Sequence, residues 1–198
     1  MDFGALVAIT MGAVLVNNYV LRQFLGVCPF LGVSKELKNS VGMSAAVIFV
    51  MLLATAVTWP IQIYLLNPNG LGFLQTIVFI LIIAALVQLV DTALKKYLPP
   101  LYEALGVFLP LMTTNCAIMG VTIINLNRGF TFAESMVNSF GAGLGFLLAM
   151  VLFSGIRAHT ENANPPASFK GMPLTLISAA ILSFAFFGFS GVVENLFG

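Results

Sequence analysis

Residues 74–93 read LQTIVFILIIAALVQLVDTA, and no charged residue occurs in this stretch before Asp91. An α-helix rises about 1.5 Å per residue, so about 20 apolar residues cross the roughly 30 Å hydrocarbon layer of a bilayer. A transmembrane β-barrel would instead need short strands in which apolar and polar residues alternate. This long, continuously apolar stretch therefore predicts a membrane-spanning α-helix.

Five further segments have a similar length and apolar character, and turn-forming or charged residues separate them. The six predicted spans are roughly Phe3–Phe30, Val41–Leu66, Leu74–Ala93, Leu101–Ile124, Ser135–Ile156 and Pro173–Val193. The sequence thus predicts an all-α integral membrane protein with six transmembrane helices. We expect residues 1–198 to form a single membrane domain.

The composition of the whole chain agrees with this class. Of 198 residues, 60% are hydrophobic and 8% are charged, and the mean hydropathy is +1.05. An ordinary soluble domain has charge on about a quarter of its residues, so a soluble enzyme, a disordered chain and a nucleic-acid-binding protein are excluded. The sequence also lacks a phosphate loop, a nucleotide fingerprint, a catalytic triad and a zinc signature. We expect no catalytic residue and no complete active site on this chain alone.

The basic residues predict the orientation in the membrane. With six spans, both termini lie on one side, and the connections on that side contain only Arg128. The connections on the opposite side contain Lys35, Lys38, Lys95, Lys96, Arg157 and Lys170. Since cytoplasmic loops carry the excess of Lys and Arg, both termini are predicted to be extracytoplasmic.

Short sequence matches divide the chain into two halves. Residues 28–34 (CPFLGVS) match residues 116–122 (CAIMGVT) in the pattern C-x-x-[LM]-G-V-[ST]. Two weaker matches follow in the same order, 39–42 (NSVG) with 138–141 (NSFG), and 72–76 with 171–175. Three spans are an odd number, so the second half enters the membrane from the opposite side. We predict a 3+3 inverted repeat, with halves of about 1–97 and 98–198.

The repeat places Cys28 and Cys116 at equivalent positions, so the two could converge near the bilayer centre. Helix-breaking and polar residues surround both, which predicts that helices one and four are broken near that depth. Packed helices with simple kinks at Pro29 and Pro110 are the alternative. The residues concerned are Asn17, Asn18, Gly26, Pro29 and Gly32 in the first span, and Gly106, Pro110, Thr113, Thr114, Asn115 and Gly120 in the fourth.

Two cysteines in matched positions suggest a metal centre. Thiolates favour soft metals and iron–sulfur clusters, and such a cluster takes four ligands. The single histidine, His159, falls in a polar loop, so a second copy or a related partner would have to supply the other ligands. Two alternatives stay open, a pair of inert buried thiols and a direct Cys28–Cys116 disulfide.

Two other features have structural interpretations. Arg22 would be costly facing lipid, so it either extends to the cytoplasmic interface or faces a partner. The sequence Gly141-Ala-Gly-Leu-Gly145 contains G-x-x-x-G, which favours close helix packing.

Three long motifs carry a family resemblance. Residues 15–21 (LVNNYVL), 24–35 (FLGVCPFLGVSK) and 109–120 (LPLMTTNCAIMG) closely resemble the RnfA family. Its members belong to the Rnf complex, an ion-translocating ferredoxin:NAD oxidoreductase. The resemblance runs the whole length of the chain. NqrE of the sodium-translocating NADH:quinone oxidoreductase represents a sister family, but Pro29 and Thr114 make the chain more similar to RnfA.

This resemblance implies that Cys28 and Cys116 are two ligands of an intramembrane [2Fe–2S] cluster. It implies that a homologous six-helix protein of opposite orientation, similar to RnfE, supplies the other two. Flavins, other iron–sulfur clusters and NAD would belong to other members of the complex, similar to RnfB, RnfC, RnfD and RnfG. The residues expected around the cluster are Gly26, Gly32, Asn115 and Gly120.

The implied function is electron transfer across a bacterial or archaeal cytoplasmic (inner) membrane, coupled to Na⁺ or H⁺ translocation. Membrane lipid is the other expected neighbour, and no nucleic acid is expected. Two alternatives use the same sequence features. A stand-alone secondary transporter also has inverted repeats and broken helices, and a structural scaffold would have two inert thiols.

Overall fold

A computed structural model describes residues 3–34, 37–68, 70, 72–97, 115–161 and 166–197. Throughout these ranges the regular structure is helical, with no strand. The elements are α1 (Phe3–Met11), the π-helical turn η1 (Gly12–Val16), α2 (Val27–Val33), α3 (Leu37–Ile61), the π-helical turn η2 (Gln62–Leu66), the 3₁₀ turn η3 (Gly72–Leu74), α4 (Gln75–Tyr97), α7 (Cys116–Asn127), α8 (Phe132–Glu161), the 3₁₀ turn η4 (Ala167–Phe169) and α9 (Met172–Phe197).

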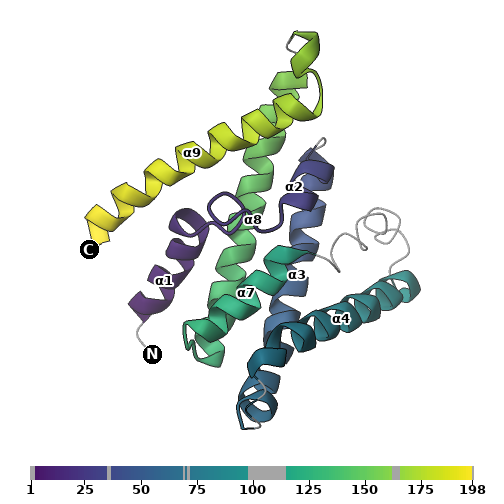
Figure 1. The fold of residues 1–198 in the computed structure, drawn as a ribbon, viewed down its shortest axis with the longest axis vertical. Helices are drawn as coiled ribbons and strands as arrows, with labels where there is room; N and C mark the ends of the chain where they lie inside the picture. The colour runs from purple at the N-terminus through teal and green to yellow at the C-terminus, as the bar shows by residue number, and fades with distance from the viewer. Residues whose placement is uncertain are drawn as a thin grey trace.

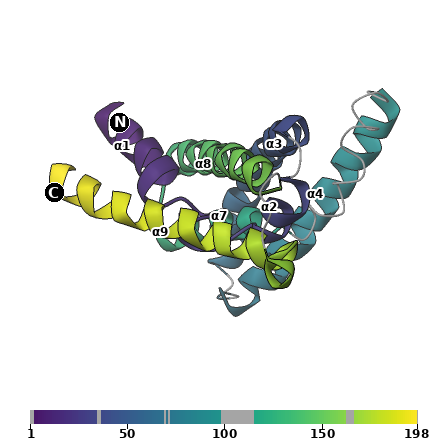
Figure 2. The same cartoon turned by 90° about the horizontal axis from the view of Figure 1, so that it is seen from above.

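Helices α3 and α8 form the centre of the fold and run antiparallel beside each other (Figure 1). Their facing side chains are large and fully buried, among them Met43, Val47, Met51, Phe146, Met150 and Phe153. Gly143 allows close approach, because a Cβ added there would lie 2.6 Å from Ile48 Cγ1. Helix α4 diverges from this pair and α9 crosses it, as the view from above shows (Figure 2).

A second small-residue contact joins α8 to α1 and η1. A Cβ added at Gly141 would lie 3.2 Å from the Cα and the carbonyl oxygen of Thr10. A Cβ added at Gly145 would lie 3.2 Å from the carbonyl oxygen of Ala13. The prediction that this glycine motif allows close helix packing is therefore confirmed.

The structure has several apolar helices, as the sequence predicts for a membrane protein. Among the described residues, three helices are long and apolar enough to cross a bilayer, over Leu37–Leu66, Gly72–Thr92 and Phe132–Thr160. Shorter apolar helices cover Val7–Val16, Cys116–Asn127 and Met172–Gly188. Most of the predicted fourth span, including Gly106, Pro110, Thr113 and Thr114, lies outside the described residues.

Three basic residues lie at one end of the described helices, whereas Lys95 and Lys96 lie apart from them at the end of α4. The start of α3, the end of α8 and the start of α9 lie together at the top of Figure 1, and the α7–α8 turn lies at the opposite end. Lys38, Arg157 and Lys170 belong to the first group, whereas Arg128 belongs to the second. The start of α1 and the end of α9 lie near each other in both views (Figures 1 and 2).

Candidate functional site

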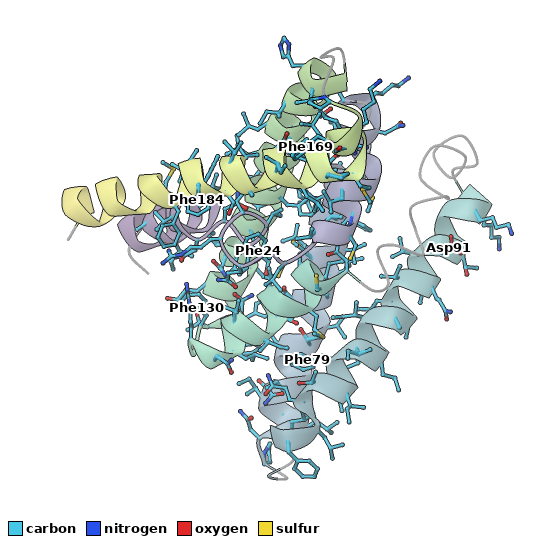
Figure 3. All side chains as sticks on the ribbon, turned by 45° about the horizontal axis from the view of Figure 1, so that its top comes forward. Phe24, Phe79, Asp91, Phe130, Phe169 and Phe184 are labelled. Carbon is cyan, nitrogen blue, oxygen red and sulfur yellow. The ribbon has the colours of Figure 1, made fainter. Side chains whose placement is uncertain are left out.

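The site is built around an interruption between two helices. The helical hydrogen-bond pattern ends at Val16 and resumes at Val27, and the residues between them form turns. We call residues 17–26 the break. Two residues of the break have positive φ, Phe24 at 56° and Gly26 at 81°. Phe24 is 64% exposed. In Figure 3 it lies on the break, which passes between α9 and α7 in that view.

Asn18 holds the break together and attaches it to α8. Its Nδ2 donates to the carbonyl oxygens of Gly145 (2.8 Å) and Val14 (3.3 Å). Its Oδ1 accepts from the backbone N–H groups of Val20 (3.0 Å) and Leu21 (3.3 Å). The side chain is 1% exposed. Asn18 therefore satisfies backbone groups that the end of the helix leaves without partners.

Arg22 also binds within the chain. Its Nη1 donates to Asn17 Oδ1 (2.9 Å) and to the carbonyl oxygen of Val16 (3.3 Å). The guanidinium carbon lies 5.9 Å from the centroid of the Phe187 ring on α9. The positive charge thus closes the carbonyl end of η1, where the helix dipole favours a cation, and sequence alone did not predict these partners.

A sulfur hydrogen bond joins the two cysteine segments. The backbone N–H of Gly26 donates to Cys116 Sγ over 2.9 Å. Glycine suits this position for two reasons, since φ is positive and an added Cβ would lie 3.1 Å from both Ala117 Cβ and Phe146 Cε2. The structure therefore brings residues 26 and 116, 90 positions apart, into direct contact.

The other three residues predicted to surround a cluster have different surroundings from one another. Asn115 caps α7, and its Oδ1 accepts from the N–H of Ala117 over 3.0 Å. Its Nδ2 is buried without a hydrogen-bond partner among the residues that the structure describes. Gly120 packs against Leu25, and an added Cβ would lie 2.5 Å from Leu25 Cδ1. Gly32, in contrast, has open space around it.

The thiols themselves are free. Cys28 is exposed on α2, and Cys116 is half-buried at the first residue of α7. The predicted alternative of a Cys28–Cys116 disulfide is absent from this structure. No group of three or more His, Cys, Asp or Glu side chains that could hold a metal occurs in the described ranges. Within those ranges the chain offers at most half of a four-thiolate ligand set.

The end of α2 is attached to α8 by two side chains of α8. Arg157 Nη1 donates to the carbonyl oxygen of Leu31 (2.7 Å) and to Ser34 Oγ (3.0 Å). One helical turn earlier on α8, the ring of Phe153 stacks on that of Phe30, with centroids 4.2 Å apart. The sequence indicated Arg157 only as a loop cation, so these contacts are new.

A buried polar network lies among α3, α7 and α8. Asn138 Nδ2 donates to Asn125 Oδ1 (2.6 Å) and to Tyr19 Oη (3.2 Å). Asn125 Nδ2 donates to Ser139 Oγ (3.0 Å), which shares a hydrogen bond with Thr55 Oγ1 (2.7 Å). Amide and hydroxyl groups often join helices in membranes in this way. Asn138 and Ser139 belong to the repeated NS motif, which could have signalled the network.

A small apolar cavity lies between the break and α9. Its volume is about 120 Å³. Ser183 Oγ donates to the carbonyl oxygen of Leu21 beside it. The lining residues are Val20, Leu21, Phe24, Val27, Phe30, Leu31, Leu176, Ala179, Ala180 and Ser183.

Comparison with known proteins gives consistent results. The family described as "Rnf-Nqr subunit, membrane protein" matches residues 6–193. The chain is 54% identical over 187 residues to the A subunit of the Na(+)-translocating ferredoxin:NAD(+) oxidoreductase complex of Acetobacterium woodii, covering 94% of this chain and 97% of that one. It is 50% identical over 190 residues to the A subunit of the ion-translocating oxidoreductase complex of Syntrophotalea carbinolica, covering 96% and 98%. The corresponding protein of Proteus mirabilis is 50% identical over 184 residues, covering 93% and 95%.

Proposed function

The chain belongs to the Rnf-Nqr family of membrane proteins, and within it to the A subunits of the ion-translocating oxidoreductase complexes. From this premise we propose that it relays electrons across the membrane through a [2Fe–2S] cluster shared with a homologous protein of opposite orientation. Cys28 and Cys116 are the two cluster ligands of this chain, and the partner supplies the other two ligands. When bound, the cluster supplies one-electron transfer.

The observation that carries the proposal is the hydrogen bond from Gly26 N–H to Cys116 Sγ. Backbone N–H groups aimed at sulfur are how proteins stabilise cluster thiolates and adjust their potential. The buried Nδ2 of Asn115 is a second donor close by. The exposure of Cys28 also supports the proposal, because a shared cluster needs one thiol accessible to another chain.

The residues of this chain then have defined tasks. Asn18 and Gly26 hold the break in the shape that brings α2 against α7. Phe146 and Ala117, both buried, exclude water from the neighbourhood of Cys116. The hydrocarbon core of a bilayer is about 30 Å thick, and a carrier near its middle divides that distance into two shorter electron-transfer steps.

The proposal includes the finer architecture and the setting. We assign the start of α2 and the start of α7 to matched positions of a 3+3 inverted repeat near the bilayer centre. The ends rich in Lys and Arg face the cytoplasm, so both termini are extracytoplasmic in the cytoplasmic membrane. Other members of the complex carry ferredoxin and NAD chemistry, and electron flow is coupled to Na⁺ or H⁺ translocation. The name of the Acetobacterium woodii relative favours Na⁺.

Low-temperature EPR of the dithionite-reduced, purified complex tests the proposal. Cys28→Ser and Cys116→Ser should each abolish the same [2Fe–2S] signal while the complex remains fully assembled. Val27→Ala is a matched control, because it alters the same turn of α2 without removing a thiol. If both cysteine variants keep the signal, the thiols are structural and the electron-relay proposal is wrong.

A further inference from the structure

Helix α2 depends on other parts of the chain for its shape. It has only seven residues and begins after Gly26 without a side-chain cap. A helix this short is unstable by itself, because nucleation costs more than a few hydrogen bonds return. Its last carbonyl groups also lack partners within the helix. Whatever binds that end therefore determines where α2, and Cys28 on it, is held.

Arg157 binds that end. Its Nη1 contacts the carbonyl oxygen of Leu31 at 2.7 Å and Ser34 Oγ at 3.0 Å, and Ser34 is fully buried. A guanidinium is always charged and can donate to two acceptors from one rigid group. A cation is favoured at the C-terminal end of a helix. The Phe30–Phe153 ring stack, one turn earlier, fixes α2 against the same face of α8.

The charge is also held on the helix that carries Cys28. Leu31 follows Cys28 by three residues, which is about 4.5 Å along the helix axis, and Arg157 Nη1 lies a further 2.7 Å from the carbonyl oxygen of Leu31, on the side away from Cys28. A cation at such a separation favours added negative charge where a bound partner excludes water between the two groups. Reduction of a cluster adds one such charge.

We infer that Arg157 is a positioning residue for Cys28 and that its charge raises the reduction potential of the shared cluster. The inference rests on the proposed function. It assigns to α8 a role in setting the electron-transfer potential, although α8 carries no ligand in that proposal.

The test is an EPR-monitored redox titration of the purified complex with Arg157→Gln and Arg157→Lys. Gln keeps an amide donor but loses the charge, so the ratio of reduced to oxidised cluster at the wild-type midpoint should fall at least tenfold, which is about 59 mV for one electron. Lys keeps the charge and should change that ratio less than threefold. Lys170→Gln is the control, because this lysine is exposed at the same end and solvent screens its charge.

Hydrogen exchange over residues 27–34 of the same complexes measures positioning separately. Both Arg157 variants should exchange faster than wild type, since both side chains are shorter than arginine and neither holds its donor in the rigid plane that places Nη1 between the Leu31 carbonyl oxygen and Ser34 Oγ. An unchanged potential in Arg157→Gln, or an equal shift in Arg157→Lys, would overturn the inference. If the complex with Arg157→Gln does not assemble, the Arg157→Lys complex provides the test. In that case, hydrogen exchange over residues 27–34 at the wild-type rate would overturn the inference. A cluster signal that survives Cys28→Ser would instead refute the proposed function itself.

Discussion

Replacing Asn18 by Ala should destabilise the protein far more than the same replacement of its neighbour Asn17. The substitution removes four hydrogen bonds, two donated to Gly145 and Val14 and two accepted from Val20 and Leu21. Each buried N–H left unpaired costs about 1 kcal/mol or more. Each lost side-chain bond in a membrane protein costs about 0.6 kcal/mol on average. Two of each kind give a loss of about 3 kcal/mol in the free energy of unfolding.

The assay is denaturant unfolding of the purified complex in detergent, compared with an Asn17→Ala variant. Asn17 has the same side chain one residue earlier, but it accepts a single side-chain bond, from Arg22. Its replacement should cost about 1 kcal/mol or less, because that contact is exposed. Equal losses for the two variants would refute the reasoning. So would a loss below about 0.5 kcal/mol for Asn18→Ala, since the four bonds would then contribute almost nothing.

Three further predictions concern single contacts. Gly26→Ala forces a side chain into a left-handed conformation and into Ala117, so it should cost about 2 kcal/mol or more in denaturant unfolding of the complex; a loss below about 0.5 kcal/mol would show that the break does not need glycine at this position. Gly143→Ala should overpack Ile48 by about 1–3 kcal/mol, and Ile48→Ala in the same chain should recover most of the melting temperature; no recovery would show that the cost lies elsewhere. Thr131→Val should remove the cap formed with Glu134 at the start of α8, at about 1 kcal/mol. The measurement is thermal unfolding against Thr131→Ser, which keeps the capping hydroxyl, and an equal loss in that control would argue against the cap.

The helices could be predicted because burial in lipid imposes long apolar runs, but their ends could not. Hydropathy predicts a second span that begins at Val41, whereas α3 begins at Leu37. Hydropathy detects the lipid-embedded length, and a helix can continue into polar residues such as Asn39 beyond it. The structure also changes the role of Pro29. It lies in the first turn of α2, where a missing N–H costs nothing, so it begins a helix rather than kinks one.

The site was predictable in part. The repeated cysteine motif identifies two segments that the structure places in contact, with Gly26, Asn115 and Gly120 at that contact. Gly32 shares the motif but has open space where a side chain would lie, because a local pattern does not say which face of a helix is covered. The role of Arg157 could not be predicted, because its partners lie more than a hundred residues away. The Thr131–Glu134 cap, in contrast, follows a T-x-x-E pattern that can be read directly from sequence.

The partners of the break also set an order for biogenesis. Asn18 pairs with a group 127 residues later, and Leu21 with one 162 residues later. At a synthesis rate of about 5–20 residues per second, the first of these partners emerges on the order of 10 s after Asn18. During that interval the nascent first segment has unpaired polar groups and cannot reach its final shape. Helix α3 can enter the bilayer meanwhile, and the N-terminal segment is then among the last parts of the chain to assemble, although it is the first to be made.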